Sequence, residues 1–451
     1  MSNTDPIAAW HALLDGPLGL ESAEWIEARQ LARGLAFGDR ALSIVTRPRF
    51  MDTAGYDTLR LASRALLGAF RTAGDAAATD PAFRAQFKLA DWEETLLDGS
   101  PALHVGSPFS RLDAFIDPDD GIARITEYNA ETPAGAAYTD ALSEIFLDAP
   151  VMRRFIEDWT VRPLPTLHIV LGVLLESWHR FRGVRSLPNV AIVDWDDVPT
   201  LSEFALCRDY FDAAGVPCVI TTPGALTYDG GILRDADGMR IDVIYKRVLI
   251  HELIAEGGLD HPMVRAVRDG AVCMVNPFHC KPLHKKASLA VLSDERNADL
   301  FSAEEMRAIA THVPWTRVIE ERTTTADGRP VDLVPHILGG RDRLVLKPND
   351  DYGGAGIVLG WEVDDATWER SVLQALDAPS IVQERIALPT ELFPAIQDGQ
   401  MVFDDRIVDT APFCWQGSFM DGLLTRISTS TLVNVTAGGG STIPSFIVEP
   451  R

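Results

Sequence analysis

The chain has 451 residues and a formal net charge of −24. This excess of acidic side chains argues against bulk binding to nucleic acid or to an anionic membrane, since both need a basic face. It still allows a small anionic ligand, because a few lysines and arginines can make a positive pocket on an acidic protein. With 46% hydrophobic and 24% charged residues, the composition is that of a globular protein large enough for more than one domain.

The N-terminal residues and the cysteines predict a cytoplasmic protein. The stretch MSNTDPIAAWHALLDG lacks a basic segment followed by an apolar run, so we expect no signal peptide. No window approaches the ~18 apolar residues of a membrane span. The five cysteines form no CxxC pair, and an odd number of thiols is typical of a reducing compartment.

Residues 1–100 are predicted to be mostly helical. Stretches such as ESAEWIEARQLARGLAF (21–37) and YDTLRLASRALLGAFRTAG (56–74) repeat apolar residues at the spacing of an amphipathic helix. From about residue 102 strand-like alternation begins. We therefore place the first domain boundary at residue 100.

Residues 101–160 are predicted to contain a pair of strands that carries metal ligands. RLDAFID and IARITEY alternate along their length, and DPDDG (117–121) between them predicts a hairpin turn. Residues i and i+2 share one face of a strand, so Glu127 and Asn129 project together, and Asp113 on the paired strand can join them. Two carboxylates and an amide oxygen are the hard ligands that Mg²⁺ prefers.

Residues 161–275 are predicted to form an α/β subdomain on the substrate side of the protein. It follows a proline-rich patch, VRPLP, at residues 161–165. NVAIVDW, LSEFALCRDYFDAAG and VPCVITT then read as a strand, a helix and a strand. That order predicts a parallel crossover unit.

Residues 276–451 are predicted to bind a nucleotide. In RLVLKPNDDYGGAGIVLG (343–360) a strand leads to Lys347 and then to a loop with three glycines, before a second strand. Such a loop lets backbone N–H groups close over phosphates, and a lysine at the strand end adds a positive charge. Neither the P-loop nor the dinucleotide-binding pattern is matched. A hairpin turn with a surface lysine is the alternative.

A second nucleotide segment, SIVQERIALPTE (380–391), begins about thirty residues later. Gln383 and Glu384 end a strand there, and a loop with Ile386 follows. In an ATP site, backbone groups of such a segment can read the adenine edge, and an acid can take the ribose hydroxyls. A Gln-Glu pair at the end of a strand is also common where the side chains are simply solvated.

Taken in order, these motifs resemble the circularly permuted ATP-grasp enzymes, of which glutathionylspermidine synthase is the best-known type. VLKP, GGAG and IVQERIALP look like the nucleotide half of an ATP-grasp enzyme, but the metal strands precede this half instead of following it. The family's Arg-x-Asp and EYNADTP are matched by RLD (111–113) and EYNAETP (127–133). The resemblance spans roughly residues 100 to 445. It implies a circularly permuted ATP-grasp fold of the α/β (α+β) class.

The resemblance also implies roles for single residues. Asp113, Glu127 and Asn129 are expected to hold Mg²⁺, with two ions at the site. Arg111 is expected to act in catalysis by facing the transferred phosphoryl group. Glu131 stands where the family has an aspartate, and it receives no metal role.

Nucleotide and substrate contacts are implied in the same way. NPFHCKPLHKKASLAVL (276–292) resembles a segment whose lysine, at a helix start, contacts the nucleotide, with Lys281 and Lys285 as alternatives to Lys286. The nucleotide-binding residues are then expected to be Lys286, Lys347, Gly353, Gly354, Gly356, Gln383, Glu384 and Ile386. The segment VIYKRVLIHEL (243–253) resembles the segment that borders the substrate site in the family. The substrate contacts are then expected to be Thr132, Lys246 and Arg247.

The function implied is an ATP-dependent carboxylate–amine ligase that forms an acyl phosphate and releases ADP and phosphate. Its partners would be a small-molecule acid and a small-molecule amine, for example amino acids or peptides. One alternative is an ATP-grasp enzyme that phosphorylates or aminates a substrate without a carboxylate, and another is a non-catalytic nucleotide-binding relative. The glycine-rich residues 437–441 are a candidate cover for the site. The sequence leaves the acid, the amine and the oligomeric state open.

Overall fold

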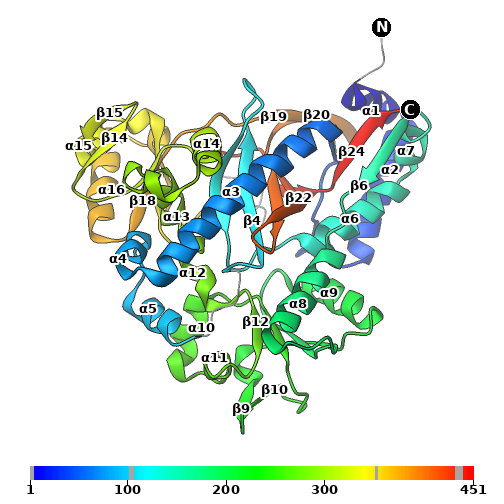
Figure 1. The fold of residues 1–451 in the computed structure, drawn as a ribbon. Helices are drawn as coiled ribbons and strands as arrows, with labels where there is room; N and C mark the ends of the chain where they lie inside the picture. The colour runs from blue at the N-terminus through cyan, green and yellow to red at the C-terminus, as the bar shows by residue number, and fades with distance from the viewer. Residues whose placement is uncertain (1–4, 101–105, 351–353, 432–439) are drawn as a thin grey trace.

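A seven-stranded antiparallel sheet lies at the centre of the molecule (Figure 1). The computed structural model describes residues 5–100, 106–350, 354–431 and 440–451. The sheet has the order β19-β20-β22-β21-β4-β5, with β23 paired to β22. Its strands are β4 (Phe109–Ile116), β5 (Ala123–Asn129), β19 (Thr390–Gln397), β20 (Gln400–Val408), β21 (Ala411–Trp415), β22 (Phe419–Ser428) and β23 (Gly440–Ile443). The predicted metal strands thus share one sheet with strands from the C-terminal part of the chain.

A smaller, four-stranded antiparallel sheet faces the central sheet across the predicted nucleotide site. Its order is β13-β18-β16-β17. The strands are β13 (Thr316–Val318), β16 (Leu344–Pro348), β17 (Val358–Leu359) and β18 (Ser380–Glu384). The elements around it are α13 (Ala287–Ser293), α14 (Ala303–His312), β14 (Thr323–Ala326), β15 (Arg329–Asp332), α15 (Leu333–Gly339) and α16 (Asp365–Asp377). Trp368 and Val372 of α16 are buried against Leu344 and Leu346 of β16, which fixes this helix on the sheet.

A parallel sheet forms the lower part of the molecule in Figure 1. Its order is β12-β11-β7-β8, with every pair parallel. The strands are β7 (Val190–Val193), β8 (Cys218–Thr221), β11 (Val243–Lys246) and β12 (Cys273–Val275). The elements associated with it are α8 (Leu167–Arg182), α9 (Leu201–Ala213), β9 (Thr227–Asp229), β10 (Ile232–Arg234), α10 (Ile250–Gly257), α11 (Pro262–Arg268) and α12 (Lys281–His284). The unit β7-α9-β8 confirms the predicted parallel crossover. The domain boundaries at residues 100, 160 and 275 stay predictions.

The N-terminal region is largely helical, as predicted, but it also contributes strands. Its elements are α1 (Pro6–Leu14), α2 (Pro17–Ala32), β1 (Ala36–Phe37), β2 (Arg40–Ala41), β3 (Arg49–Met51), α3 (Thr53–Thr79), α4 (Pro81–Arg84) and α5 (Asp91–Asp98). Strand β3 pairs with β24 (Ser445–Pro450), which also pairs with β6 (Trp159–Pro163). Helices α6 (Ala136–Asp148) and α7 (Pro150–Phe155) complete this side. Helix α1, with which the described residues begin, and strand β24 near the C-terminus lie in one region of the molecule (Figure 1).

Helix α3 crosses one face of the central sheet (Figure 1). It begins after Asp52, whose carboxylate accepts a hydrogen bond from the backbone N–H of Gly55 at 2.7 Å and so caps the helix. The ring of Phe70 stacks on that of Tyr128 in β5, with centroids 4.0 Å apart. Since Tyr128 and Glu127 are neighbours on one strand, this packing turns Glu127 to the other face.

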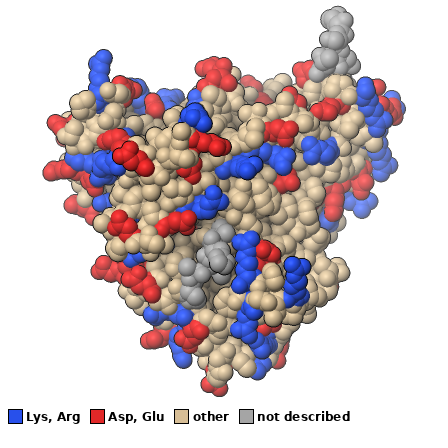
Figure 2. All heavy atoms as spheres, in the orientation of Figure 1, with Lys and Arg blue, Asp and Glu red and all other residues tan. Residues whose placement is uncertain are grey.

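Figure 2 shows basic and acidic side chains interspersed over the visible face of the molecule. Within the described residues, no helix is both long enough and apolar enough to cross a membrane.

Helix α3 supplies a test of the packing because it carries a buried and an exposed leucine. Leu66 is 0% exposed and Leu61 is 69% exposed. We expect Leu66→Ala to lower the free energy of unfolding by about 2–5 kcal/mol, because it leaves a cavity in the core between α3 and the central sheet. Leu61→Ala should change it by less than about 0.5 kcal/mol. Urea unfolding followed by circular dichroism measures both; equal effects would contradict the packing of α3.

Candidate active site

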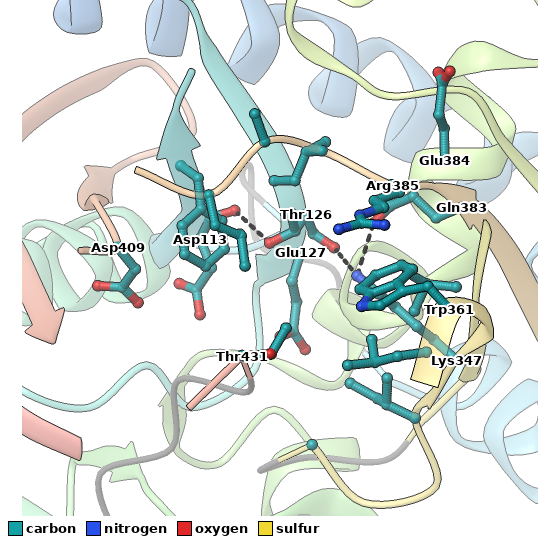
Figure 3. A pocket seen from close by; sticks show the side chains of 18 of the residues that line it. Asp113, Thr126, Glu127, Lys347, Trp361, Gln383, Glu384, Arg385, Asp409 and Thr431 are labelled. Carbon is teal, nitrogen blue, oxygen red and sulfur yellow. Dashed lines mark hydrogen bonds between the residues drawn. The ribbon is translucent and has the colours of Figure 1, made fainter. Parts of the chain in front are cut away.

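A cavity of about 840 Å³ is lined by residues of the central sheet and of the smaller antiparallel sheet. Strands β4 and β5 contribute to its lining, and so do β16 and β18 (Figure 3). The segment 384–388, which leads from β18 towards β19, also lines it. The apolar lining residues are Phe115, Val345, Ile357, Leu359, Trp361, Ile386, Ala387 and Leu388. The cavity thus has an apolar wall and a wall that carries charged groups.

The charged wall is built by the register of β4 and β5. Asp113 pairs with Glu127, and Arg111 pairs with Asn129. Paired residues lie on the same face of a sheet, and so do residues two apart on one strand, so all four side chains share one face. The prediction that Asp113, Glu127 and Asn129 project together is confirmed by this register.

Asn129 has a buried amide oxygen that accepts no hydrogen bond from the described residues. A buried acceptor without a partner is costly unless something else occupies it. A hard cation is one such partner, and the two carboxylates beside Asn129 are of the matching type. In the described part of the chain, no group of three or more His, Cys, Asp or Glu side chains is arranged to hold a metal. The two carboxylates and the amide oxygen match the ligand chemistry of Mg²⁺ and are the metal candidate.

Asp113 is bonded to two guanidinium groups. Arg111 donates from Nε to Oδ1 at 2.6 Å and from a terminal nitrogen to Oδ2 at 2.9 Å, and Arg426 donates to the same Oδ2 at 2.9 Å. Burial acts to raise the pKa of Asp113, but the two arginines outweigh it and hold the pKa at about 2. The Asp113 carboxylate is therefore ionised at neutral pH, as a metal ligand must be.

Glu127 is neutralised by a lysine from a distant segment. The Nζ atom of Lys286, the residue before α13, lies 3.1 Å from a carboxylate oxygen of Glu127. Burial acts to raise the pKa of Glu127, but Lys286 and the other nearby cations lower it overall. Of the three lysines that the sequence offered as the nucleotide lysine, the structure places Lys286 against the predicted metal ligands.

Lys347 points into the cavity and is held by two acceptors (Figure 3). Its ammonium group donates to the carbonyl of Thr126 at 3.0 Å and to Oε1 of Gln383 at 2.7 Å. Burial is the largest influence and lowers the pKa of Lys347 to about 8. Gln383 is 2% exposed and also donates to Thr316 at 3.1 Å, so its side chain orients Lys347. Its predicted contact with the nucleotide stays a prediction.

The end of β18 and the segment after it border the cavity with residues 384–388. Glu384 is exposed, and its carboxylate points away from the other labelled side chains in Figure 3. The guanidinium of Arg385 lies over the ring of Trp361, 4.1 Å from the ring centroid. Ile386 is among the lining residues, as an adenine-reading segment would require.

The glycine-rich loop is only partly described. Gly354 lines the cavity and has a φ of +81°, a backbone conformation that favours glycine. Gly356 also has a positive φ but is not among the residues that line the cavity. Gly353 lies outside the described residues, and so do residues 437–439 of the predicted cover. Gly440 and Ser441 of that segment belong to β23.

The predicted substrate residues lie away from the cavity lining. Lys246 is 1% exposed and its ammonium group is 3.5 Å from Glu131, while Arg247 is 6% exposed, donates to the carbonyl of Pro133 and lies 3.8 Å from Glu203. Thr132 is half-buried in the same turn. These contacts fix the turn that follows β5, and the predicted roles in substrate binding stay predictions.

Glu131 is the centre of a buried charge cluster. Its side chain is 0% exposed, one oxygen accepts from the backbone N–H of Ile250 at 2.5 Å, and the other accepts from Lys281 at 3.1 Å. Lys281 also bonds to Asp350 at 2.8 Å, as does Lys285. The cluster therefore ties β5, the parallel sheet and the start of the glycine-rich loop together, and it engages the two alternative nucleotide lysines.

The sequence analysis missed Asp409 and Arg426. Arg426, in β22, bonds through its backbone N–H and its guanidinium to Asp409, and both residues line the cavity. Figure 3 shows Asp409 beside Asp113. Asp409 lies in DDRIVDT and Arg426 in LLTRIST. In each stretch a charged residue stands at or near an apolar strand, and this was the signal that the sequence offered. The sequence could not show that Arg426 lies near Asp113, because β22 is not paired with β4 directly and is joined to it through β21.

Comparison with known proteins found relatives in sequence and a solved structure with a similar fold. A scan against protein-family models gave no match. A protein of Frankia alni named "Putative glutamate--cysteine ligase 2-3" is 30% identical over 344 residues, which are 71% of this chain and 36% of that protein. A Frankia casuarinae protein named "Putative glutamate--cysteine ligase 2-2" is 27% identical over 350 residues, with the same two shares. The chain thus spans little more than a third of the length of these curated relatives.

A solved structure shows the fold. The glutathione synthetase-like effector GSS30 from Globodera pallida, in its apo form, matches with a TM-score of 0.61 and 14% identity, over 99% of this chain and 98% of that chain. At this identity the match speaks for the fold alone. The chain has a mixed α/β fold similar to that of the glutathione synthetase-like effector.

The lowered pKa of Lys347 gives a test by pH. The folded protein releases the lysine proton near pH 8, while the unfolded chain keeps it until about 10.5, so between these values the unfolded state binds more protons. Relative to Lys347→Met, the free energy of unfolding of the wild type should therefore rise with pH over this window, by about 3 kcal/mol in all. Denaturant titrations of both proteins at several pH values measure this difference. Parallel profiles would contradict the burial of a charged Lys347.

Proposed function

We propose that the chain is an ATP-dependent ligase of the circularly permuted ATP-grasp type, which joins a carboxylate to an amine through an acyl phosphate. The observation that carries the proposal is the cavity between two sheets, where an apolar wall and Lys347 meet the ionised pair Asp113 and Glu127. The names of the relatives support the ligase class. The fold similarity to a glutathione synthetase-like effector supports the architecture.

The nucleotide would lie between the two sheets. The adenine ring would pack against Val345, Leu359 and Ile386, with the backbone of the segment after β18 at its polar edge. Lys347 and Lys286 would contact the phosphates, since Lys286 is paired with Glu127 and Lys347 lines the cavity and bonds to the carbonyl of Thr126, the residue before Glu127. The union of β4 and β5 with downstream strands in one sheet supports the permuted arrangement.

Asp113, Glu127 and Asn129 would hold Mg²⁺. The ion would neutralise negative charge on the phosphates and help to orient them. The chain's own residues prepare the site, because cations keep both carboxylates ionised and the amide oxygen of Asn129 accepts no bond from the described residues.

The reaction would proceed in two displacements. A substrate carboxylate oxygen attacks the γ-phosphorus of ATP, the bond to the bridging oxygen breaks, and ADP leaves with the electron pair. The amine nitrogen then attacks the carbonyl carbon of the acyl phosphate, the carbon–oxygen bond to phosphate breaks, and phosphate leaves while the nitrogen loses a proton. The chain would align the reactants and stabilise charge. This mechanism needs no covalent enzyme nucleophile, and the five cysteines are free and buried.

The substrates would be small acids and amines of the amino-acid or peptide class, as the names of the relatives suggest. Trapping with hydroxylamine tests this even while the natural amine is unidentified, because hydroxylamine takes the place of that amine. With Mg·ATP, hydroxylamine and a panel of amino acids and short peptides, we expect ADP and a hydroxamate to appear together, only when a suitable carboxylate is present. Glu127→Gln should abolish both products because it removes a metal ligand.

The matched control for this test is Glu144→Gln, whose side chain is 65% exposed and whose partner is Arg33 at the surface. That variant should keep full activity. A phosphorylated product without a hydroxamate would favour the alternative of phosphorylation of a non-carboxylate substrate. Full activity of Glu127→Gln would contradict the site.

A further inference from the structure

Two arginines, Arg111 and Arg426, bond to Asp113, and they differ in their other contacts. Arg111 uses Nε and one terminal nitrogen on Asp113, and its other terminal nitrogen donates to the carbonyl of Ala134 at 2.9 Å. Its side chain is 6% exposed, and it is not among the residues that line the cavity. Arg111 is therefore fully engaged in fixing Asp113 and the turn after β5.

Arg426 approaches the same carboxylate from β22 and lines the cavity. Its side chain is 21% exposed, while that of Asp113 is 9% exposed. One terminal nitrogen reaches Oδ2 of Asp113 at 2.9 Å. The guanidinium of Arg426 thus lies between a predicted metal ligand and the open volume of the cavity.

Asp409 also holds Arg426, and its Oδ2 contacts the same terminal nitrogen that bonds to Asp113. It is 1% exposed, and it accepts hydrogen bonds from the backbone N–H of Arg426, at 2.7 Å, and from the guanidinium. A cation that binds Asp113 would compete with Arg426 for Oδ2, but it would leave the bonds to Asp409 in place. The guanidinium would then keep its position with a donor free for another anion.

The other arginines that line the cavity lie elsewhere. Arg385 stacks on Trp361 at the apolar wall. Arg343 precedes β16 and is exposed, and it lies four residues before Lys347, or about 13 Å along an extended chain. Among the arginines of the cavity lining, Arg426 is the one bonded to Asp113.

We infer that Arg426 is a catalytic residue that contacts the transferred phosphoryl group of ATP, with Asp409 and Arg111 as positioning residues; this rests on the proposed function. A guanidinium can make two parallel hydrogen bonds to phosphoryl oxygens and stabilises the charge that builds on them during transfer. The contact would matter for the transferring group and little for bound ADP. Arg426 should therefore act on the phosphoryl step and not on nucleotide binding.

Calorimetry with Mg·ADP, in the absence and presence of aluminium fluoride, separates an effect on the phosphoryl step from an effect on nucleotide binding. Aluminium fluoride imitates the transferring phosphoryl group, so the wild type should bind Mg·ADP more tightly in its presence. Arg426→Gln should bind Mg·ADP within about twofold of the wild type but lose roughly 10²-fold of the gain. The matched control Arg180→Gln, whose arginine is 40% exposed and paired with Glu176 outside the cavity lining, should behave as the wild type.

Each outcome decides the inference. An undiminished gain in Arg426→Gln would overturn it and leave the proposed function standing, and so would a wild type that binds Mg·ADP without any gain. A wild type that does not bind Mg·ADP would overturn the proposed function together with the inference. If thermal melting shows that Arg426→Gln does not fold, Arg426→Lys keeps the charge beside Asp409. It should lose roughly tenfold of the gain, because an ammonium group cannot make the paired bonds.

Discussion

The pairing of Asp113 with Glu127 across β4 and β5 is the constraint on which the arrangement of the site depends. Two carboxylates side by side in a buried region repel each other and lose hydration, so they persist only if cations reach them. One cation, Arg111, lies two residues from Asp113 on the same strand, and the others come from distant parts of the chain, namely Arg426 of β22 and Lys286 just before α13. Satisfying this one pair therefore brings the central sheet, the C-terminal strands and the segment before α13 to a common point. The same charges leave the site ready for a hard cation and a polyphosphate.

A second buried carboxylate, that of Glu131, is held in the same way and connects the site to the parallel sheet. Its carboxylate is fully buried and would be strongly destabilising without partners, and it finds them in Lys281, Lys246 and the backbone of Ile250. Lys281 also forms an ion pair with Asp350, where the glycine-rich loop begins. Residues of β5 and of the turn after it thus serve different purposes. Glu127 lines the cavity and Asn129 shares its face of the sheet, whereas Glu131 joins the parts of the molecule that enclose the cavity.

The sequence alone predicted what depends on local spacing. The i, i+2 rule placed Glu127 and Asn129 on one face, the turn at 117–121 predicted the hairpin that brings Asp113 to them, and the strand before the glycines delivered Lys347 to the cavity. Contacts between distant strands were out of reach. The proximity of Arg426 to Asp113 follows from the order β22-β21-β4, which no local pattern encodes.

The central claim is that the cavity binds Mg·ATP through Lys347. Isothermal titration of a non-hydrolysable ATP analogue with Mg²⁺ tests it most directly, with wild type, Lys347→Ala and, as a matched control, Lys88→Ala, whose lysine is paired with Glu320 away from the cavity lining. The account predicts binding by the wild type and Lys88→Ala, and binding at least about tenfold weaker in Lys347→Ala, since a buried ammonium contact to phosphate is lost. Equal binding by all three proteins, or no binding by the wild type, would contradict it.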